Sequence, residues 1–336
     1  MGVRDGAAYL DHALASLATQ DFADFEIVLV DNGSRDGTAR IVADWEAREP
    51  RIRALRLERP GLARSLNHAA AFARAPYLAR LDSDDICLRS RLGTQYAAMQ
   101  TRPGLGMLGA FVEVIDRNGR KLRDRELPVG DTEIKEFLRS GNPFVHSAIM
   151  MRRDVFERVG GYREGLRLCE DFDLWCRLAE VTELANHAAP LVQYRQHAAG
   201  LSFRQATRLA LVDTCIIAAQ HARRRGEPEP FMRGCPTLRR ALALLGIPRW
   251  AFQYRMLKVA SNAARLAIEF GEHGLARQGR RRTWRLLFGL PMGWMSLRGA
   301  GHILAAHFRP YSRLRRQVMR ARLRQRWSFT GTRKKS

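Results

Sequence analysis

Short apolar runs alternate with amphipathic segments through the first 82 residues, and this alternation limits the fold more than any other feature. The run FEIVLVD (25–31) ends in Asn32-Gly33-Ser34, which is typical of a strand that leaves its sheet through a turn. The pattern continues as a helix at 38–48, a strand at 52–57, a helix at 62–74 and a strand at 76–82, after a first helix at 6–20. It predicts an α/β protein with a mostly parallel sheet between helices.

Acidic residues end two of these strands, Asp31 the first and Asp82 the last. Ligands of open α/β sheets bind at the carboxyl ends of the strands. We therefore expect Asp31 and Asp82 to face one site.

The later sequence divides into a region with strands and a region without them. A hairpin is expected at 106–125 with its turn at Asn118-Gly119, followed by a strand at 144–151, a helix that starts near Glu170 and a last strand at 191–197. Beyond residue 203 the patterns are helical. The sequence predicts a domain at 1–203 and a helical extension at 204–336.

The extension carries the excess positive charge. Of a net charge of +23, residues 201–336 contribute 29 basic and 5 acidic side chains, whereas residues 1–200 contain 28 and 29. Arginine clusters interleaved with aromatic residues favour an anionic membrane surface as partner. A solvated helical bundle is the alternative, and nucleic acid is disfavoured because the chain contains no recognised nucleic-acid motif.

The cysteines and the chain start indicate the compartment. Five cysteines without a Cys-x-x-Cys pair fit reduced thiols in a cytoplasmic protein. The first residues contain no apolar run typical of a signal peptide, and the apolar stretch 286–297 is too short to span a bilayer. We expect a cytoplasmic protein that can lie on the inner face of the membrane.

The segment Asp82-Ser83-Asp84-Asp85 places three carboxylates at the end of an apolar strand. Clustered carboxylates repel one another unless a cation lies between them, and Mg²⁺ and Mn²⁺ prefer oxygen ligands. The segment predicts a divalent metal site, with a solvated acidic turn as the alternative.

Five motifs follow one another at characteristic spacings, namely FEIVLVDNGSRDGT, YLARLDSDD, FVHSAIMMRRDVFERVGGYRE, EDFDLWCRLAE and YRQH. The series resembles the inverting family 2 glycosyltransferases of the GT-A fold from residue 3 to about residue 203. The resemblance implies a Rossmann-like GT-A domain, a nucleotide-sugar donor, with a UDP-sugar preferred, and a divalent metal ion.

The resemblance also implies roles for the acidic motifs. Asp82 and Asp84 match the residues that hold a divalent ion against the donor diphosphate, and Asp85 is expected to ligate it or to lie behind it. In the pair Glu170-Asp171, Asp171 matches the base that deprotonates the acceptor hydroxyl. Without the resemblance, a carboxylate at a helix start is more simply a capping residue.

The remaining matches concern the donor site. Asp31 matches an acid that lies against the nucleoside, and Asn32 replaces the second acid of that motif, which puts the base preference in question. Asn67 lies on the helix that borders the donor in relatives, with an exposed structural asparagine as the alternative. His197 resembles a late histidine that some relatives use as a further metal ligand. His146 and Trp175 are expected to be structural.

Relatives begin with an apolar strand, and this sequence starts just after it, near Val3. We expect the first strand to be missing, either because the start codon was assigned too late or because the protein is impaired. The first interpretation is favoured, since the acidic residues downstream are intact.

These features predict transfer of a sugar, with inversion, from a nucleotide donor to a hydroxyl of a glycan or lipid-linked saccharide, in surface polysaccharide synthesis. Two alternatives stay open. One is a catalytically silent partner of a glycan-assembly complex, and the other is a nucleic-acid-binding protein that acts through the basic extension.

Overall fold

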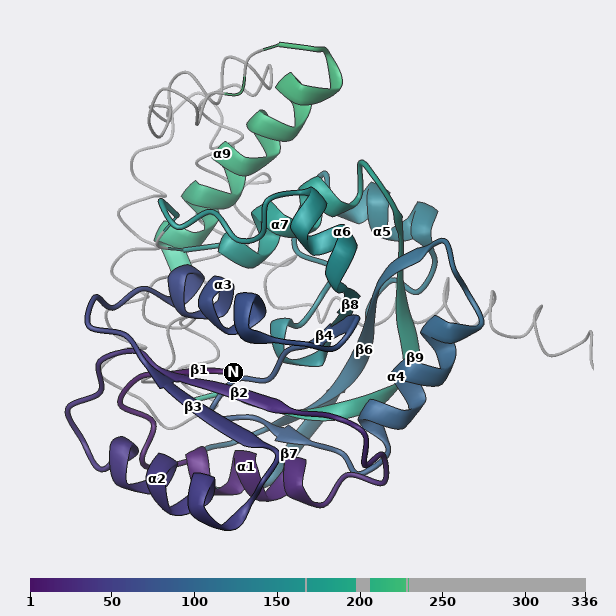
Figure 1. The fold of residues 1–336 in the computed structure, drawn as a ribbon. Helices are drawn as coiled ribbons and strands as arrows, with labels where there is room; N and C mark the ends of the chain where they lie inside the picture. The colour runs from purple at the N-terminus through teal and green to yellow at the C-terminus, as the bar shows by residue number, and fades with distance from the viewer. Residues whose placement is uncertain (167, 198–205, 228, 230–336) are drawn as a thin grey trace, which may run out of the picture. The chain divides into compact units, whose positions relative to one another are not determined.

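The computed structural model describes residues 1–166, 168–197, 206–227 and 229, all of which belong to one compact unit (Figure 1). The predicted boundary at residue 203 and most of the basic extension lie outside these residues. The apolar stretch 286–297 and Cys235 also lie outside them.

A three-stranded parallel sheet forms the first half of the fold, in the order β1-β2-β3. Helices α1 and α2 lie toward one face of this sheet and α3 toward the other (Figure 1). The elements are β1 (Gly2–Val3), α1 (Leu10–Ala18), β2 (Ile27–Asp31), α2 (Thr38–Arg48), β3 (Ile52–Arg56) and α3 (Leu62–Phe72). The predicted strand–helix alternation is confirmed here.

The second sheet is mixed, with the order β4-β8-β6-β9-β5 and with β7 paired to β6. Its strands are β4 (Tyr77–Ala79), β5 (Ile86–Cys87), β6 (Leu105–Ile115), β7 (Lys121–Arg125), β8 (Met150–Arg152) and β9 (Glu183–Arg195). The antiparallel pair β6–β7 confirms the hairpin predicted around Asn118-Gly119. The other helices are α4 (Arg91–Gln100), α5 (Asp131–Phe137), η1 (His146–Ala148), α6 (Arg153–Arg158), α7 (Glu170–Leu178) and α9 (Ala206–Arg224).

The segment predicted as one strand at 144–151 contains a 3₁₀ turn, η1, before the three-residue β8. The turn closes with a hydrogen bond from the Ala148 amide to the Val145 carbonyl. It presents the Ser147 hydroxyl to the backbone and carboxylate of Asp82. A tertiary contact therefore overrides the strand propensity of this segment.

The last strand, β9, is longer than the predicted 191–197 and begins at Glu183. Its first half contains Asn186, His187 and Pro190, which weaken the sequence signal for a strand. Pairing with β6 holds this half in place, and the register shifts where Phe111 lies opposite Pro190. Cross-strand hydrogen bonding therefore decides the length of β9.

A first strand was expected to be missing, but Gly2 and Val3 form β1, which pairs in parallel with β2. The Met1 amine donates to the Val28 carbonyl at 2.8 Å. Beside it lies a cavity of about 620 Å³, lined by residues that include Val28, Leu66 and Leu78. The two sheets are not hydrogen-bonded to each other, and this cavity lies between β2 and β4.

Two further expectations concern the cysteines and the membrane. Cys87, Cys169, Cys176 and Cys215 are free thiols and are buried. No helix in these residues combines the length and the apolar composition needed to cross a bilayer.

Candidate active site

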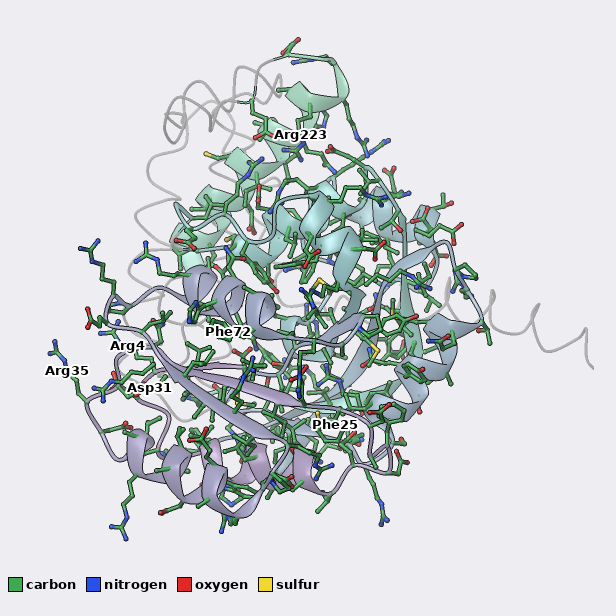
Figure 2. The ribbon with its side chains drawn as sticks, viewed as in Figure 1. Arg4, Phe25, Asp31, Arg35, Phe72 and Arg223 are labelled. Carbon is green, nitrogen blue, oxygen red and sulfur yellow. The ribbon has the colours of Figure 1, made fainter. Side chains whose placement is uncertain are left out.

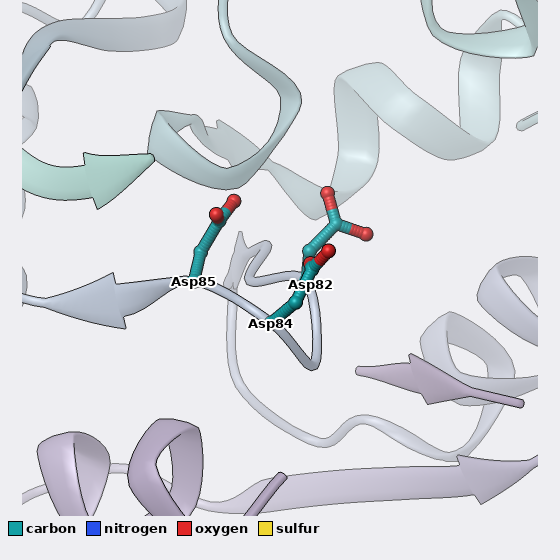
Figure 3. Close-up of side chains that lie close together, drawn as sticks. All are labelled: Asp82, Asp84 and Asp85. Carbon is teal, nitrogen blue, oxygen red and sulfur yellow. The ribbon is translucent and has the colours of Figure 1, made fainter. Parts of the chain in front are cut away.

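Three carboxylates converge in the loop between β4 and β5, where Asp82, Asp84 and Asp85 offer oxygens that lie within 4.8 Å of one another (Figure 3). The loop is anchored from β9, because Arg195 donates from Nε to the Asp84 carbonyl at 2.8 Å. The Arg195 amide also donates to Asp85 Oδ1 at 2.7 Å. Contacts from the end of β9 therefore hold this cluster in place after β4.

The Asp85 carboxylate indicates that the cluster suits a cation. Asp85 is 1% exposed, and its Oδ2 atom has no hydrogen-bond partner among the described residues. Burial, together with the charges of Asp84 and Asp82, raises the pKa of Asp85 well above its usual value. An all-oxygen donor set with one unpaired buried oxygen fits Mg²⁺ or Mn²⁺.

Sequence reasoning missed the cation that already lies beside this cluster. Arg80 is 5% exposed and forms an ion pair with Asp82, and Ser147 donates to Asp82 Oδ2 at 2.9 Å. Burial opposes ionisation of Asp82, but the Arg80 guanidinium brings its pKa below the usual value. The spacing of two residues along an extended segment was the available signal for Arg80, because such side chains share a face.

His197 lies where the sequence placed it. Its Nε2 atom is 3.2 Å from Asp84 Oδ2, although the two residues are 113 positions apart. The imidazole packs against Tyr9, with ring centroids 5.5 Å apart. His197 is therefore positioned to join Asp84 as a metal ligand, and that role stays a prediction.

A second pair of carboxylates heads helix α7. Glu170 is 6% exposed, and burial, followed by the charge of Asp171, raises its pKa to about 7. Burial also raises the pKa of Asp171, while a hydrogen bond from Asn142 Nδ2 at 2.8 Å opposes that rise. Asn142 precedes a proline, which indicates a turn, but nothing in the sequence places it against α7.

The two acidic sites lie within electrostatic range of each other. The charge of Asp82 raises the pKa values of both Glu170 and Asp171, and the charge of Arg80 lowers them. Arg80 therefore acts on the carboxylates of both sites.

Two aromatic residues that were expected to be structural, His146 and Trp175, pack near these carboxylates. His146 Nε2 lies 2.7 Å from the Tyr162 hydroxyl, and burial lowers the pKa of His146 well below 6.5. The imidazole is therefore neutral at pH 7. Trp175 is fully buried and packs edge-on against His146.

The predicted nucleoside-side residues lie at the end of β2. Asp31 is buried and accepts a hydrogen bond from the Ser34 amide at 2.9 Å, while Arg35 projects away from the same loop (Figure 2). Asn32 Oδ1 accepts the Gly61 amide at 2.7 Å, next to the start of α3. The uncharged Asn32 therefore joins β2 to α3.

Asn67 uses both ends of its amide on one neighbour. Its Nδ2 donates to the Tyr162 carbonyl at 2.8 Å, and its Oδ1 accepts the Tyr162 amide at 2.9 Å. Gly161 has a φ of +62°, and a Cβ there would lie 2.8 Å from Asn67 Oδ1. Asn67 therefore holds α3 against the segment before α7, and contact with a donor stays a prediction.

Comparison with known proteins agrees with this geometry. The family model for glycosyl transferase family 2 matches residues 3–160. An O-antigen biosynthesis glycosyltransferase of Escherichia coli, WbnJ, is 31% identical over 201 residues, which cover 59% of this chain and 78% of the relative. The chain belongs to glycosyl transferase family 2.

Two further relatives of this glycosyltransferase are covered less fully. The putative glycosyltransferase EpsE of Bacillus subtilis is 33% identical over 54% of this chain and 65% of its own length. The amylovoran biosynthesis glycosyltransferase AmsE of Erwinia amylovora is 33% identical over 50% of this chain and 63% of its own length. The chain thus spans just under two thirds of these two proteins.

Solved structures confirm the GT-A fold of this glycosyltransferase. The mannosyltransferase PcManGT of Pyrobaculum calidifontis, in complex with GDP-Man and Mn²⁺, has a TM-score of 0.51 and 18% identity over 91% of this chain and 84% of its own. TarS 1-349 of S. aureus, in complex with UDP-GlcNAc, has a TM-score of 0.52 and 16% identity over 84% and 90%.

Proposed function

We propose that this glycosyltransferase moves a sugar from a nucleotide-diphosphate donor to a hydroxyl of a glycan or lipid-linked saccharide, with inversion at the anomeric carbon. The observation that carries the proposal is the pairing of two acidic sites. The carboxylates of Asp82, Asp84 and Asp85 form an oxygen-rich cation site, and the Glu170-Asp171 pair lies within its electrostatic range.

The first site suits the donor. Asp82, Asp84, Asp85 and His197 would hold Mg²⁺ or Mn²⁺. When bound, the metal ion neutralises the negative charge that develops on the departing nucleoside diphosphate. Asp31 and Asn32, at the carboxyl end of β2, would lie against the nucleoside.

The second site suits the acceptor. Asp171 is half-buried, and its raised pKa makes it a stronger base than an exposed aspartate, provided that it is ionised at the working pH. Asn142 orients the carboxylate through its hydrogen bond. Direct displacement with one base and no enzyme nucleophile gives inversion.

The names of the relatives support a polysaccharide as the acceptor class. WbnJ is named for O-antigen biosynthesis and AmsE for amylovoran biosynthesis, and both products are surface polysaccharides. PcManGT carries a GDP-sugar and TarS a UDP-sugar, so the fold admits both donor types. We propose a UDP-sugar for this chain, with the basic extension bringing the enzyme to lipid-linked acceptors on an anionic membrane.

The test is release of nucleoside diphosphate from a panel of UDP- and GDP-sugars in the presence of Mn²⁺ and membrane lipid extract. We expect one donor to give metal-dependent release, and Asp84→Ala to abolish it. Asp44→Ala is the matched control, because Asp44 is exposed on α2, where it forms a 3.9 Å ion pair with Arg40.

Two outcomes would count against the proposal. Release that persists in Asp84→Ala would remove the metal site from the mechanism. Folded protein that releases nothing from any donor would favour the silent-partner alternative.

A further inference from the structure

Helix α9, which follows the predicted catalytic domain, packs along α7. Ile216 and Ile217 of α9 lie in the same buried cluster as Phe172 and Trp175 of α7. At the head of α7, the Cys169 thiol points to the Leu209 carbonyl of α9 at 3.6 Å. Thus α9 contacts the helix that begins with Glu170-Asp171 at its start and along its length.

Cys169 has a φ of 60°, a left-handed conformation that non-glycine residues seldom adopt. Such a conformation persists where surrounding contacts impose it. Cys169 comes immediately before Glu170. The contact with α9 therefore acts on the residue whose backbone conformation orients the start of α7, where Glu170 and Asp171 lie.

A chain of ion pairs connects α9 to both ends of α7. Asp173, which is fully buried, binds Arg177 at 2.8 Å and Arg163 at 3.2 Å. Arg163 continues to Glu229 at 2.7 Å. Arg223 of α9 then joins Glu229 at 2.7 Å to Glu180, just past the end of α7, at 2.9 Å (Figure 2). Six side chains of alternating charge therefore form one network.

We propose that Arg223 is a positioning residue that, through this network, fixes the helix carrying the Glu170-Asp171 pair. This inference rests on the proposed role of Asp171. Arg223 is the member that ties α9 to α7, since it holds Glu229 and Glu180 together. Helix α9, which lies beyond residue 203, then contributes to the function of the catalytic domain.

The physical basis is the partial burial of the network. An ion pair that loses one partner leaves the other charge uncompensated, and the cost rises as water is excluded. Removal of Arg223 leaves Glu229, whose side chain is 11% exposed, with Arg163 as its remaining partner in the network, and leaves Glu180, whose side chain is 27% exposed, without this partner. We expect the end of α7 and the link to Asp173 to loosen. A loosened helix lets water approach Asp171, so its pKa falls toward the usual value.

The test compares Arg223→Gln with Arg225→Gln in the full chain. Arg225 is two residues further along and pairs with Glu227 at 2.9 Å, with both side chains about half exposed. Arg225→Gln is therefore the same chemical change at an arginine whose ion-pair partner lies outside the network of Arg223. We would measure turnover as a function of pH at temperatures well below unfolding, and the affinity for nucleoside diphosphate with Mn²⁺.

For Arg223→Gln we expect kcat to fall about tenfold and the acidic limb of its pH profile to move to lower pH. The affinity for nucleoside diphosphate should stay within twofold of wild type, because the residues proposed for the donor and its metal ion lie at the ends of β2 and β9 and in the β4–β5 loop. Arg223→Lys should recover part of the loss, and Arg225→Gln should behave as wild type.

The proposal is overturned if Arg223→Gln keeps the wild-type kcat and acidic limb, even if it unfolds at a lower temperature. If this variant does not fold, Glu180→Gln removes one partner alone and should show the same shifts on a smaller scale. Asp171→Asn separates the two claims, since wild-type turnover in that variant would refute the base, whatever Arg223 does.

Discussion

Arg80 forms an ion pair with Asp82, so one of the carboxylates predicted to bind a metal ion already has a buried cation beside it. Asp82 also accepts the Ser147 hydroxyl. These contacts hold the carboxylate in place. The Arg80 guanidinium also offsets part of the negative charge that would attract a metal ion. We therefore expect the cluster to bind a divalent ion more weakly than three free carboxylates would.

Replacing Arg80 with methionine should raise the affinity for Mn²⁺ about tenfold, because a charge-assisted contact of roughly 1.5 to 3 kcal/mol no longer competes for Asp82. Without metal, the variant should unfold several degrees lower, since Asp82 loses its partner. Titration of Mn²⁺ by calorimetry measures the first effect, and thermal unfolding with and without Mn²⁺ measures the second. Arg74→Met, which removes an exposed guanidinium from its ion pair with Glu26, is the control. An unchanged or lower Mn²⁺ affinity in Arg80→Met would refute this reading.

The burial of Glu170 makes stability depend on pH. Its pKa is about 7 in the folded state against an ordinary 4.5, so the folded protein holds a proton that the unfolded chain releases between these values. Its contribution is full below pH 4.5 and is lost as the pH rises through 7. Glu170→Gln removes this loss and should be more stable than wild type at pH 8, by on the order of 2 kcal/mol.

Thermal unfolding across pH 4.5 to 8 checks this prediction, with the two proteins converging at the acidic end. Glu164→Gln, at an exposed pair with Arg64, is the control for a change of charge. Parallel pH profiles of wild type and Glu170→Gln would show that Glu170 does not titrate in this range.

The hydrogen bond from Asn142 to Asp171 should matter for turnover more than for stability. Asn142→Ala removes a contact that orients the proposed base and lowers its pKa. We expect kcat to fall about tenfold, as for loss of one hydrogen bond to a charged group, and the acidic limb of the pH profile to move to higher pH. Asn118→Ala, in the exposed β6–β7 turn, is the control and should leave kcat and the acidic limb unchanged. An acidic limb at the wild-type pH would show that Asn142 does not act on the proposed base.

The sequence by itself determined the features that depend on neighbouring residues. Hydrophobic periodicity located α1 to α3 and β2 to β4, because burial of one face repeats at a fixed spacing along the chain. The acidic segments at 82–85 and 170–171 could also be found from the sequence, because their charged residues are adjacent in the chain. The motifs around them were sufficient for the family.

Only the tertiary structure decided which distant groups meet. Asn142 lies against Asp171, and Arg223 binds Glu180 from a helix assigned to another region. The same holds for the segment 144–151, where contact between Ser147 and Asp82 replaces part of a strand with a turn. Such contacts arise when hydrogen bonding and burial bring strands and helices together over long separations, and local propensity is too weak to specify them.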